Sequence, residues 1–442
     1  LFFDINWKTY VLHASIINVL VTLISFFFFC KLGLNYKYSL LYCAGISVLG
    51  YSQTGTPFMD HHAFMFTFIS SLYLLLAVKF EKRIYWHLSS VFLVFSFFSK
   101  QLPSALMLIC LFFLFILYYI INHKNFKNIL TFFLTGVFTV LIIFLLFYYL
   151  DIPIENVIVQ YILYPMTIGV NRQENLNFDL NNTVFQFKFI YFSIIPLILA
   201  IKNIQNKISK DINELMFLLV LLCLLIVFLI SQLLTKNQII IFFIIPFFLG
   251  ISHFYLSVLK NNRLTTILLL ILLFVSVTKF HFRFNEKKKF MDLESADFNL
   301  ALNGTLLDKT MAGIKWITPY YINEPDKEIN LLIETKEIIN EDQEEKIIMS
   351  DYQILQFLTQ NNNVSPNKWY DDMSVPAKNN IYRSYYLSFL KNSIVSQKII
   401  HIYIIGKDVP HGIDEIFKDK NCAQYKNINE LTMIANIKNC KN

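Results

Sequence analysis

The sequence is poor in charge, glycine and proline. Only 16% of its 442 residues are charged and glycine and proline occur 11 times each, whereas hydrophobic residues make up 55% and aromatic residues 17%. An ordinary soluble domain carries about 25% charged residues, so this balance excludes that class. It predicts a polytopic α-helical membrane protein.

Several motifs of soluble enzymes are missing from the sequence. It has no Cys-x-x-Cys pair, no His-x-x-x-His pattern and no glycine-rich phosphate loop, so zinc hydrolases and nucleotide-binding proteins have no support. We expect no nucleic-acid partner. The first residues show no basic stretch followed by an apolar core, so we expect no signal peptide within the given sequence.

Cysteine occurs six times, and four of these residues lie in apolar segments, where they act as small hydrophobic side chains. Cys422 and Cys440 are the pair in the polar C-terminal tail. If the tail is extracytoplasmic, its oxidising surroundings would allow a disulfide between them.

Ten apolar segments have the composition of membrane-spanning helices, which need about 20 residues to cross the hydrocarbon. The shorter ones, such as Ile84 to Ser99, also fit tilted or re-entrant elements packed against neighbours. The predicted helices lie near residues 10–30, 38–54, 62–79, 84–99, 102–122, 128–150, 187–201, 215–235, 238–258 and 264–279.

Lysine and arginine are distributed unevenly between alternate short loops. One set of loops holds twelve of them, and the other holds two, Lys100 and Lys236. Because cytoplasmic loops collect basic residues, the first set is predicted to face the cytoplasm. Its members are Lys31, Lys37, Lys79, Lys82, Arg83, Lys124, Lys127, Lys202, Lys207, Lys210, Lys260 and Arg263.

The polar residues of the remaining short loops therefore gather on the outer face. Placing a carboxylate beside two imidazoles at a bilayer boundary costs free energy, so such a group is expected to serve a function. Because these polar residues share one face, they predict a site for a polar, anionic ligand. Each piece alone has a simpler explanation: a snorkelling lysine, histidines resting in the headgroup layer, or a hairpin turn. These residues are Asp60, His61 and His62, Lys100 and Gln101, and Lys236 and Asn237.

The long outer connection from Asp151 to about Gln186 has a pattern of its own. Apolar residues at helical spacing between Ile152 and Tyr164 predict a helix lying in the membrane interface. Arg172 follows in a polar, loop-like stretch. Such a helix is expected in an enzyme that binds a lipid-linked substrate. It is equally expected if the helix only covers the outer rim of the bundle.

The tail has a soluble composition, and we divide the chain into a membrane domain, 1–280, and an extracytoplasmic domain, 281–442. The basic run from Phe282 to Lys289 argues for the cytoplasm, but the five basic loops outweigh it. Alternating helix and strand patterns predict a small α/β domain. The helix patterns are Ala296 to Ile317, Ile354 to Thr359 and Ile381 to Leu390, and the strand patterns are Ile347 to Met349, Ile399 to Ile405 and Met433 to Ala435.

The order of these parts resembles the GT-C superfamily of multi-spanning glycosyltransferases, which take a sugar from a polyprenyl-phosphate donor on the non-cytoplasmic face. The segment from Gly55 to Ala63 is similar to the acidic motif of that superfamily's second outer loop. Phe98-Ser99-Lys100-Gln101-Leu102-Pro103 resembles the lysine motif at the next outer boundary. Leu234-Thr235-Lys236-Asn237, with Pro246, resembles the late hairpin before a proline-bearing span. The likeness covers roughly residues 5–280.

The resemblance implies an enzyme of a bacterial cell membrane, with its site and its tail facing the periplasm or the exterior. It would transfer a hexosyl or pentosyl group from a polyprenyl-phosphate-linked sugar donor to a lipid, glycan or protein acceptor, amid membrane lipid. The family's usual catalytic base is an aspartate in a first outer loop. Asp4 is no clear counterpart, so we expect the sequence to be a fragment without that base.

The outer-face residues would then bind the substrate. Positive charge is needed where a phosphate leaving group develops negative charge, which implicates Lys100, Lys236 and Arg172. Asp60 and His61 would hold a divalent metal ion, the one cofactor that we consider. The substrate-binding residues would be Asp60, His61, His62, Lys100, Gln101, Arg172, Lys236 and Asn237.

Two other functions stay open. Archaeal oligosaccharyltransferase catalytic subunits resemble this chain in an Asp-His-His at a comparable outer loop, but their Trp-Trp-Asp motif has only Lys368-Trp369-Tyr370-Asp371-Asp372 as its nearest equivalent. A lipid or polysaccharide transporter without enzymatic activity would need polar residues buried in mid-span or inverted repeats. The sequence has few charges inside spans and no internal repeat.

Overall fold

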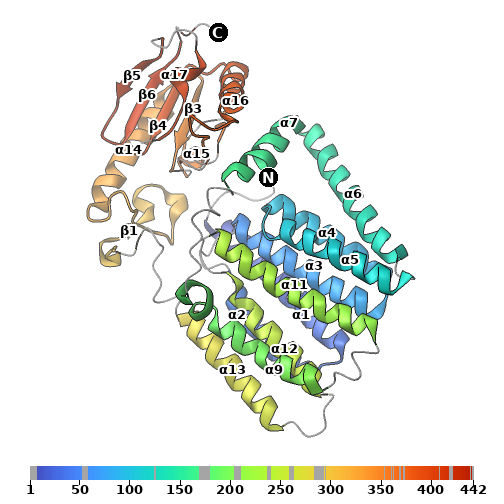
Figure 1. Cartoon of the computed structure of the whole chain (residues 1–442). Helices are drawn as coiled ribbons and strands as arrows, with labels where there is room; N and C mark the ends of the chain where they lie inside the picture. Colours follow the sequence, from blue (N-terminus) through green and yellow to red (C-terminus); the bar gives the residue numbers. More distant parts are fainter. Residues whose placement is uncertain are drawn as a thin grey trace. The chain divides into compact units, whose positions relative to one another are not determined.

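The computed structural model of the chain describes residues 7–51, 58–123, 126–168, 180–203, 211–235, 240–257, 263–282, 293, 295–352, 354–359, 361, 363–367, 370–371, 374–407, 409–417, 422–438 and 440. The chain forms two compact units, which Figure 1 shows as a set of helices and a mixed sheet with helices. The helical unit comprises Tyr10–Ile158 and Gly169–Lys288, and the α/β unit comprises Leu1–Thr9, Val159–Ile168 and Lys289–Asn442.

A helix lies at each of the ten positions predicted from apolar length. Within the described part of the chain, six helices are long and apolar enough to cross a membrane, which identifies an integral membrane protein. They are α1 (Trp7–Leu32), α3 (Met59–Phe80), α5 (Ser104–Ile121), α6 (Phe126–Tyr149), α11 (Ile212–Thr235) and α13 (Arg263–Phe282). The shorter helices are α2 (Tyr36–Gly50), α4 (Arg83–Ser99), α9 (Lys188–Asn203) and α12 (Ile244–Ser257), the last preceded by the 3-10 turn η4 (Ile241–Phe243).

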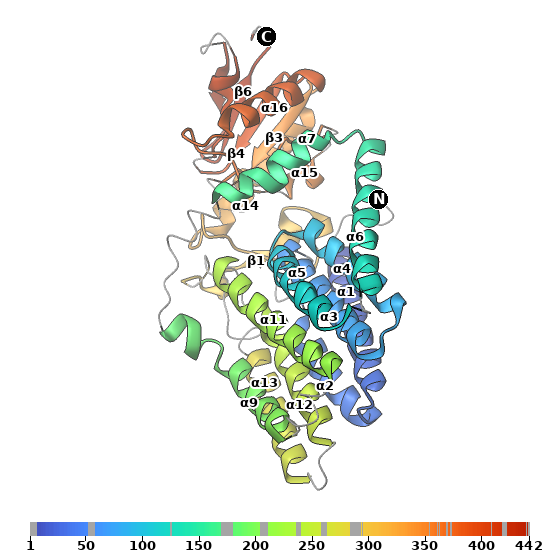
Figure 2. The ribbon, with the colours of Figure 1, turned by 45° about the vertical axis from the view of Figure 1, so that its right-hand side comes forward.

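Helix α3 lies at the centre of the helical unit. Of its most apolar window, 78% is buried inside the protein, against 17% for α6 at the rim. It packs against α4 and α11, and Figure 2 shows it among its neighbours. The apolar surface that α6 exposes is the kind that lipid covers in a membrane.

Small polar residues bring α3 and α4 close together. Ser70 Oγ donates a hydrogen bond to the Ser89 carbonyl at 2.7 Å, and Ser96 Oγ donates to the Ala63 carbonyl at 2.7 Å. Lipid tails are as apolar as leucine, so packing of small residues and hydrogen bonds between helices hold membrane bundles together.

The predicted helix of the long connection is present. The chain is helical through α7 (Ile154–Asn156), the π-helical stretch η2 (Val157–Leu163) and residues 164–168. Asn380 Nδ2 donates to Thr167 Oγ1 at 3.0 Å within the α/β unit. The end of this helical segment therefore packs with the tail.

A four-stranded sheet in the order β3-β4-β6-β5 forms the centre of the α/β unit. Strands β3 and β4 are parallel, and the other neighbours are antiparallel. Its strands are β3 (Lys346–Ser350), β4 (His401–Ile405), β5 (Gln424–Asn427) and β6 (Thr432–Asn436), and a short pair, β1 (Leu302–Asn303) and β2 (Lys315–Trp316), lies outside it. The helices are α14 (Pro325–Glu341), α15 (Leu355–Leu358), α16 (Arg383–Ser396) and α17 (Ile413–Ile416).

Helices cover both faces of this sheet because successive strand side chains point to opposite sides. Ile347 and Ile402 belong to a core with α16 and α17, whereas Ile348 and Tyr403 belong to a core with α14 and α15. Figure 1 shows α14 and α16 flanking the strands. The predicted α/β character of the tail is confirmed.

The strand predictions are confirmed by β3, β4 and β6, but the helix predicted for Ala296 to Ile317 is wrong. There Asp297, Asn303 and Asp308 each accept a hydrogen bond from the backbone N–H two residues further on. Such bonds favour short turns over a continuous helix. The long helix of this region is α14, with Pro325 in its first turn.

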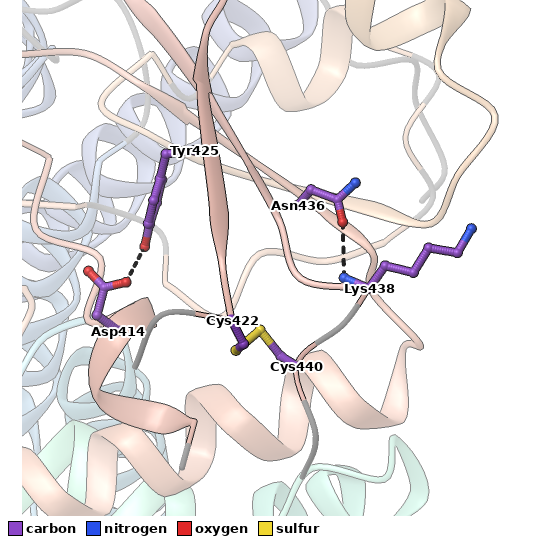
Figure 3. The surroundings of a disulfide bond; sticks show 6 residues. All are labelled: Asp414, Cys422, Tyr425, Asn436, Lys438 and Cys440. Carbon is purple, nitrogen blue, oxygen red and sulfur yellow. Dashed lines mark hydrogen bonds between the residues drawn. A yellow bond between two sulfur atoms is a disulfide. The ribbon is translucent and has the colours of Figure 1, made fainter. Parts of the chain in front are cut away.

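Cys422 and Cys440 form a disulfide, with their Cα atoms 4.9 Å apart (Figure 3). Cys422 precedes β5 and Cys440 follows β6. The start of β5 pairs with the end of β6, so the disulfide links these two neighbouring strand ends. Beside it Tyr425 OH donates to Asp414 Oδ1 at 2.6 Å. The disulfide that an extracytoplasmic tail would allow is present.

Candidate functional site

Asp60 and Lys100 meet at one end of the helical unit. Asp60 lies in the first turn of α3, and Lys100 is the C-cap residue of α4. Lys100 Nζ lies 2.5 Å from Asp60 Oδ1, with 24% of the lysine side chain exposed and 9% of the aspartate side chain. A carboxylate at a helix N-terminus also faces the positive end of the helix dipole. The pair therefore presents a partly exposed ammonium on a fixed carboxylate.

Ser96 fixes the two helix ends that carry this pair. Its hydroxyl is bonded to the Ala63 carbonyl and lies 2.7 Å from Thr67 Oγ1, both on α3. Ser96 is one turn before Lys100, and Ala63 is one turn after Asp60. The buried serine thus sets the distance between the ends of α3 and α4.

His61 points into the protein rather than toward the ion pair. It is 1% exposed, and its Nε2 lies 2.7 Å from the Gly50 carbonyl at the end of α2. The carbonyl only accepts, so Nε2 carries the proton and donates. Among the described residues, its Nδ1 is buried and has no hydrogen-bond partner. His61 therefore links α3 to α2.

His62 faces α1 instead. Its Nδ1 donates to the Phe58 carbonyl at 2.9 Å, and its Nε2 lies 3.2 Å from Nε2 of His13. The rings of His13 and His62 are 4.9 Å apart between centroids. The three consecutive residues beginning at Asp60 thus contact three different helices.

The other predicted site residues are Gln101, Arg172, Lys236 and Asn237. Gln101 follows Lys100, and its carbonyl accepts from Ser104 Oγ at 3.1 Å. Arg172, Lys236 and Asn237 lie outside the described residues.

A side chain of α11 bonds to the backbone where the next described segment begins. Gln232 Oε1 accepts a hydrogen bond from the Ile240 backbone N–H at 2.9 Å, and Gln232 is only 4% exposed. This buried amide joins the end of α11 to the start of η4.

The metal ion predicted at Asp60 and His61 does not fit their arrangement. The Asp60 carboxylate pairs with Lys100, and the His61 Nε2 is bonded to the Gly50 carbonyl. Consecutive side chains on a helix point in different directions. The carboxylate of Asp60 and the ring of His61 therefore do not face one common ion. Where side chains are described, no group of three histidine, cysteine, aspartate or glutamate residues could hold a metal ion.

A second polar cluster joins the opposite end of α3 to α11 and α12. Lys79 pairs with Glu214 of α11, and Tyr255 of α12 donates to the same carboxylate. Nearby, Asn213 Nδ2 donates to Glu81 Oε1 at 2.7 Å. Because Glu214 is 8% exposed and has both partners, this cluster stabilises the packing of three helices.

The stretch compared with the oligosaccharyltransferase motif lies in the α/β unit. Tyr370 is buried in its core, and its hydroxyl lies 2.7 Å from Ser365 Oγ. Asp371 Oδ1 accepts from the Ser374 N–H at 2.6 Å, as in a turn. Lys368, Trp369 and Asp372 lie outside the described residues.

Sequence reasoning missed two residues of this region, His13 and Ser96. An ionisable residue inside an apolar span is a functional candidate by default, and His13 has that position. Ser96 has no such mark, because serine is common in packed membrane helices. Its role follows only from the contact between α3 and α4.

No protein-family model, curated protein or solved structure matches this chain. Its six candidate spans and its α/β tail identify it as a helical integral membrane protein, and no family assignment follows from these comparisons.

Proposed function

We propose that this protein transfers a sugar from a polyprenyl-phosphate-linked donor to a lipid, glycan or protein acceptor on the outer face of a membrane. It crosses the membrane about ten times, in the manner of the GT-C superfamily. The observation that carries the proposal is the contact between Asp60 and Lys100. Asp60 and Lys100 belong to two segments that resemble separate motifs of that superfamily, and the two side chains form one ion pair.

The reaction needs positive charge at the leaving group. The bond between the anomeric carbon and a phosphate oxygen breaks, and the oxygen keeps the electron pair. Donors held in advance beside a developing anion are usually the largest source of catalysis. Lys100 is suited to this role because Asp60 orients its ammonium group while part of the side chain stays exposed.

The outer location rests on the loops and on the α/β unit. The segment Val159–Ile168 follows α6 and the tail follows α13, yet both belong to one compact unit. This grouping supports a topology in which α6 and α13 end on the same side of the membrane, which is also what the distribution of lysine and arginine favours. The Cys422–Cys440 disulfide supports an oxidising compartment for that side.

Donor consumption tests the proposal. Membranes that carry the full-length protein are incubated with polyprenyl-phosphate sugars, and loss of the donor is followed for the parent and for Lys100→Ala. We expect Lys100→Ala to lower turnover by about 10²- to 10³-fold. Turnover equal to that of the parent would contradict the proposal.

Lys82→Ala is the matched control. Lys82 is exposed at the other end of α4, where it is the N-cap residue without a side-chain capping bond. Its removal takes away the same charge from the same helix, and we expect turnover to be unchanged.

A further inference from the structure

His13 of α1 and His62 of α3 face each other with the same ring nitrogen. Their Nε2 atoms are 3.2 Å apart, and their ring planes are inclined by 56°. His13 is exposed, and His62 is partly exposed. Both residues lie within two turns of the first residue of their helices, α1 and α3.

The tautomer of His62 is fixed by the backbone. Its Nδ1 lies 2.9 Å from the Phe58 carbonyl, which only accepts, so Nδ1 carries the proton. Nε2 then presents a lone pair toward His13. A backbone carbonyl on the far ring nitrogen is a usual partner of metal-binding histidines, since it orients the ring and raises its basicity.

We propose that His13 and His62 are the protein ligands of a divalent transition-metal site, with Zn²⁺ as the representative ion. Two imidazole nitrogens at about 2.0–2.1 Å from a tetrahedral Zn²⁺ lie roughly 3.3 Å apart, and the observed separation is 3.2 Å. Imidazole ligands suit Zn²⁺, Cu²⁺ and Ni²⁺, whereas Mg²⁺ and Ca²⁺ prefer oxygen. Water completes the coordination, because the described structure offers no third histidine, cysteine or carboxylate ligand.

Metal binding replaces a hydrogen bond between the two rings. In the metal-free protein His13 Nε2–H donates to the lone pair of His62 Nε2. When the ion binds, the His13 proton moves from Nε2 to Nδ1, so both Nε2 lone pairs face the metal and no net proton is released. Metal binding by the two rings can be measured without any sugar transfer, so failure of this site and failure of the proposed function are distinguishable.

Zinc binding without any sugar donor tests the inference. The full chain is purified in detergent without a histidine tag, and bound Zn²⁺ is counted by equilibrium dialysis against ZnCl₂. We expect the parent to bind one Zn²⁺ more per chain than His13→Gln or His62→Gln. Cu²⁺ in place of Zn²⁺ should give nitrogen couplings from two imidazoles in its EPR spectrum, and these should be lost in both variants.

His123→Gln is the matched control. His123 is an exposed histidine near the start of α6, where its ring contacts Tyr119. This variant should keep the zinc stoichiometry of the parent. Equal stoichiometry in the parent and in both site variants would overturn the inference, as would a parent whose Cu²⁺ spectrum shows a single imidazole. Because the two variants alter different helices, misfolding of one does not remove the test.

Discussion

Asp60 lies in the first turn of α3 and pairs with the Lys100 ammonium group. Only 9% of its side chain is exposed, so water replaces a lost partner poorly. Removing Lys100 should take the cation away from this buried carboxylate, which costs about 1–3 kcal/mol. Loss of stability and loss of catalysis must therefore be separated at this pair.

An exchange of the two charges separates them. The double variant Asp60→Lys with Lys100→Asp restores an ion pair, although a lysine in the first turn of α3 opposes the helix dipole. We expect its thermal unfolding midpoint to recover part of the loss seen in Lys100→Ala, while donor turnover stays low. Full recovery of turnover would show that the pair only supports the fold.

Glu328 is a fully buried carboxylate in the α/β unit, and it accepts three hydrogen bonds. Trp316 Nε1, Thr318 Oγ1 and Tyr352 OH lie 2.8, 2.5 and 2.6 Å from it. Glu328→Gln turns one accepting oxygen into an NH₂ group, so we expect a loss of about 1–3 kcal/mol. Proteolysis of the tail in urea measures this loss. Glu337→Gln, at an exposed position of the same helix, should leave the urea midpoint unchanged.

Asp342 makes the stability of the α/β unit depend on pH. Burial alone would raise its pKa, but hydrogen bonds from His401, the Glu344 N–H and Tyr403 outweigh burial and hold the pKa below its ordinary value. Since the unfolded chain takes up the proton first, this stabilisation is complete above the unfolded pKa of about 3.9. It is lost as the pH falls through the lower folded value.

Asp342→Asn should therefore lower the urea midpoint for proteolysis of the tail at neutral pH, and that midpoint should then fall less steeply in acid. An acid dependence as steep as that of the parent would contradict this role of Asp342. Tyr403→Phe, which removes one of the three donors, should give an intermediate slope.

At the scale of elements, apolar length predicts the membrane helices because a span must satisfy its own backbone in lipid. The prediction failed in the tail, where polar side chains compete for the backbone. Asp297, Asn303 and Asp308 hold turns that a hydropathy pattern does not reveal. Strand β5 also has no apolar pattern, because all four of its residues are exposed.

The packing of α3 on α4 positions the candidate site. Ser96→Ala removes hydrogen bonds to Ala63 and Thr67, each worth about 0.6 kcal/mol in a membrane protein. We expect a small decrease in the thermal unfolding midpoint. We also expect a several-fold loss of donor turnover, because the helix ends that carry Asp60 and Lys100 are no longer held together by Ser96. Ser99→Ala removes only a bond within α4 and should keep turnover. Equal turnover in both variants would rule out this role for Ser96.

At the scale of the whole molecule, local patterns could predict a membrane part and a soluble part, with a boundary near residue 280. They could not predict that Val159–Ile168 belongs with the tail, because that grouping depends on contacts such as Asn380 to Thr167 across 213 positions. The convergence of Asp60 and Lys100 was predictable as a shared face, but not as a direct contact. Distances between side chains follow from packing, which a single sequence does not specify.

Donor consumption by sealed vesicles tests the central claim most directly, because it reports the site and its side of the membrane together. Right-side-out and inverted vesicles carrying the full-length protein receive a short-chain polyprenyl-phosphate sugar from outside. We predict consumption by right-side-out vesicles, its loss in Lys100→Ala and its retention in Lys82→Ala. Consumption by inverted vesicles alone, or equal consumption by Lys100→Ala and the parent, would contradict an outer sugar-transfer site built on Asp60 and Lys100.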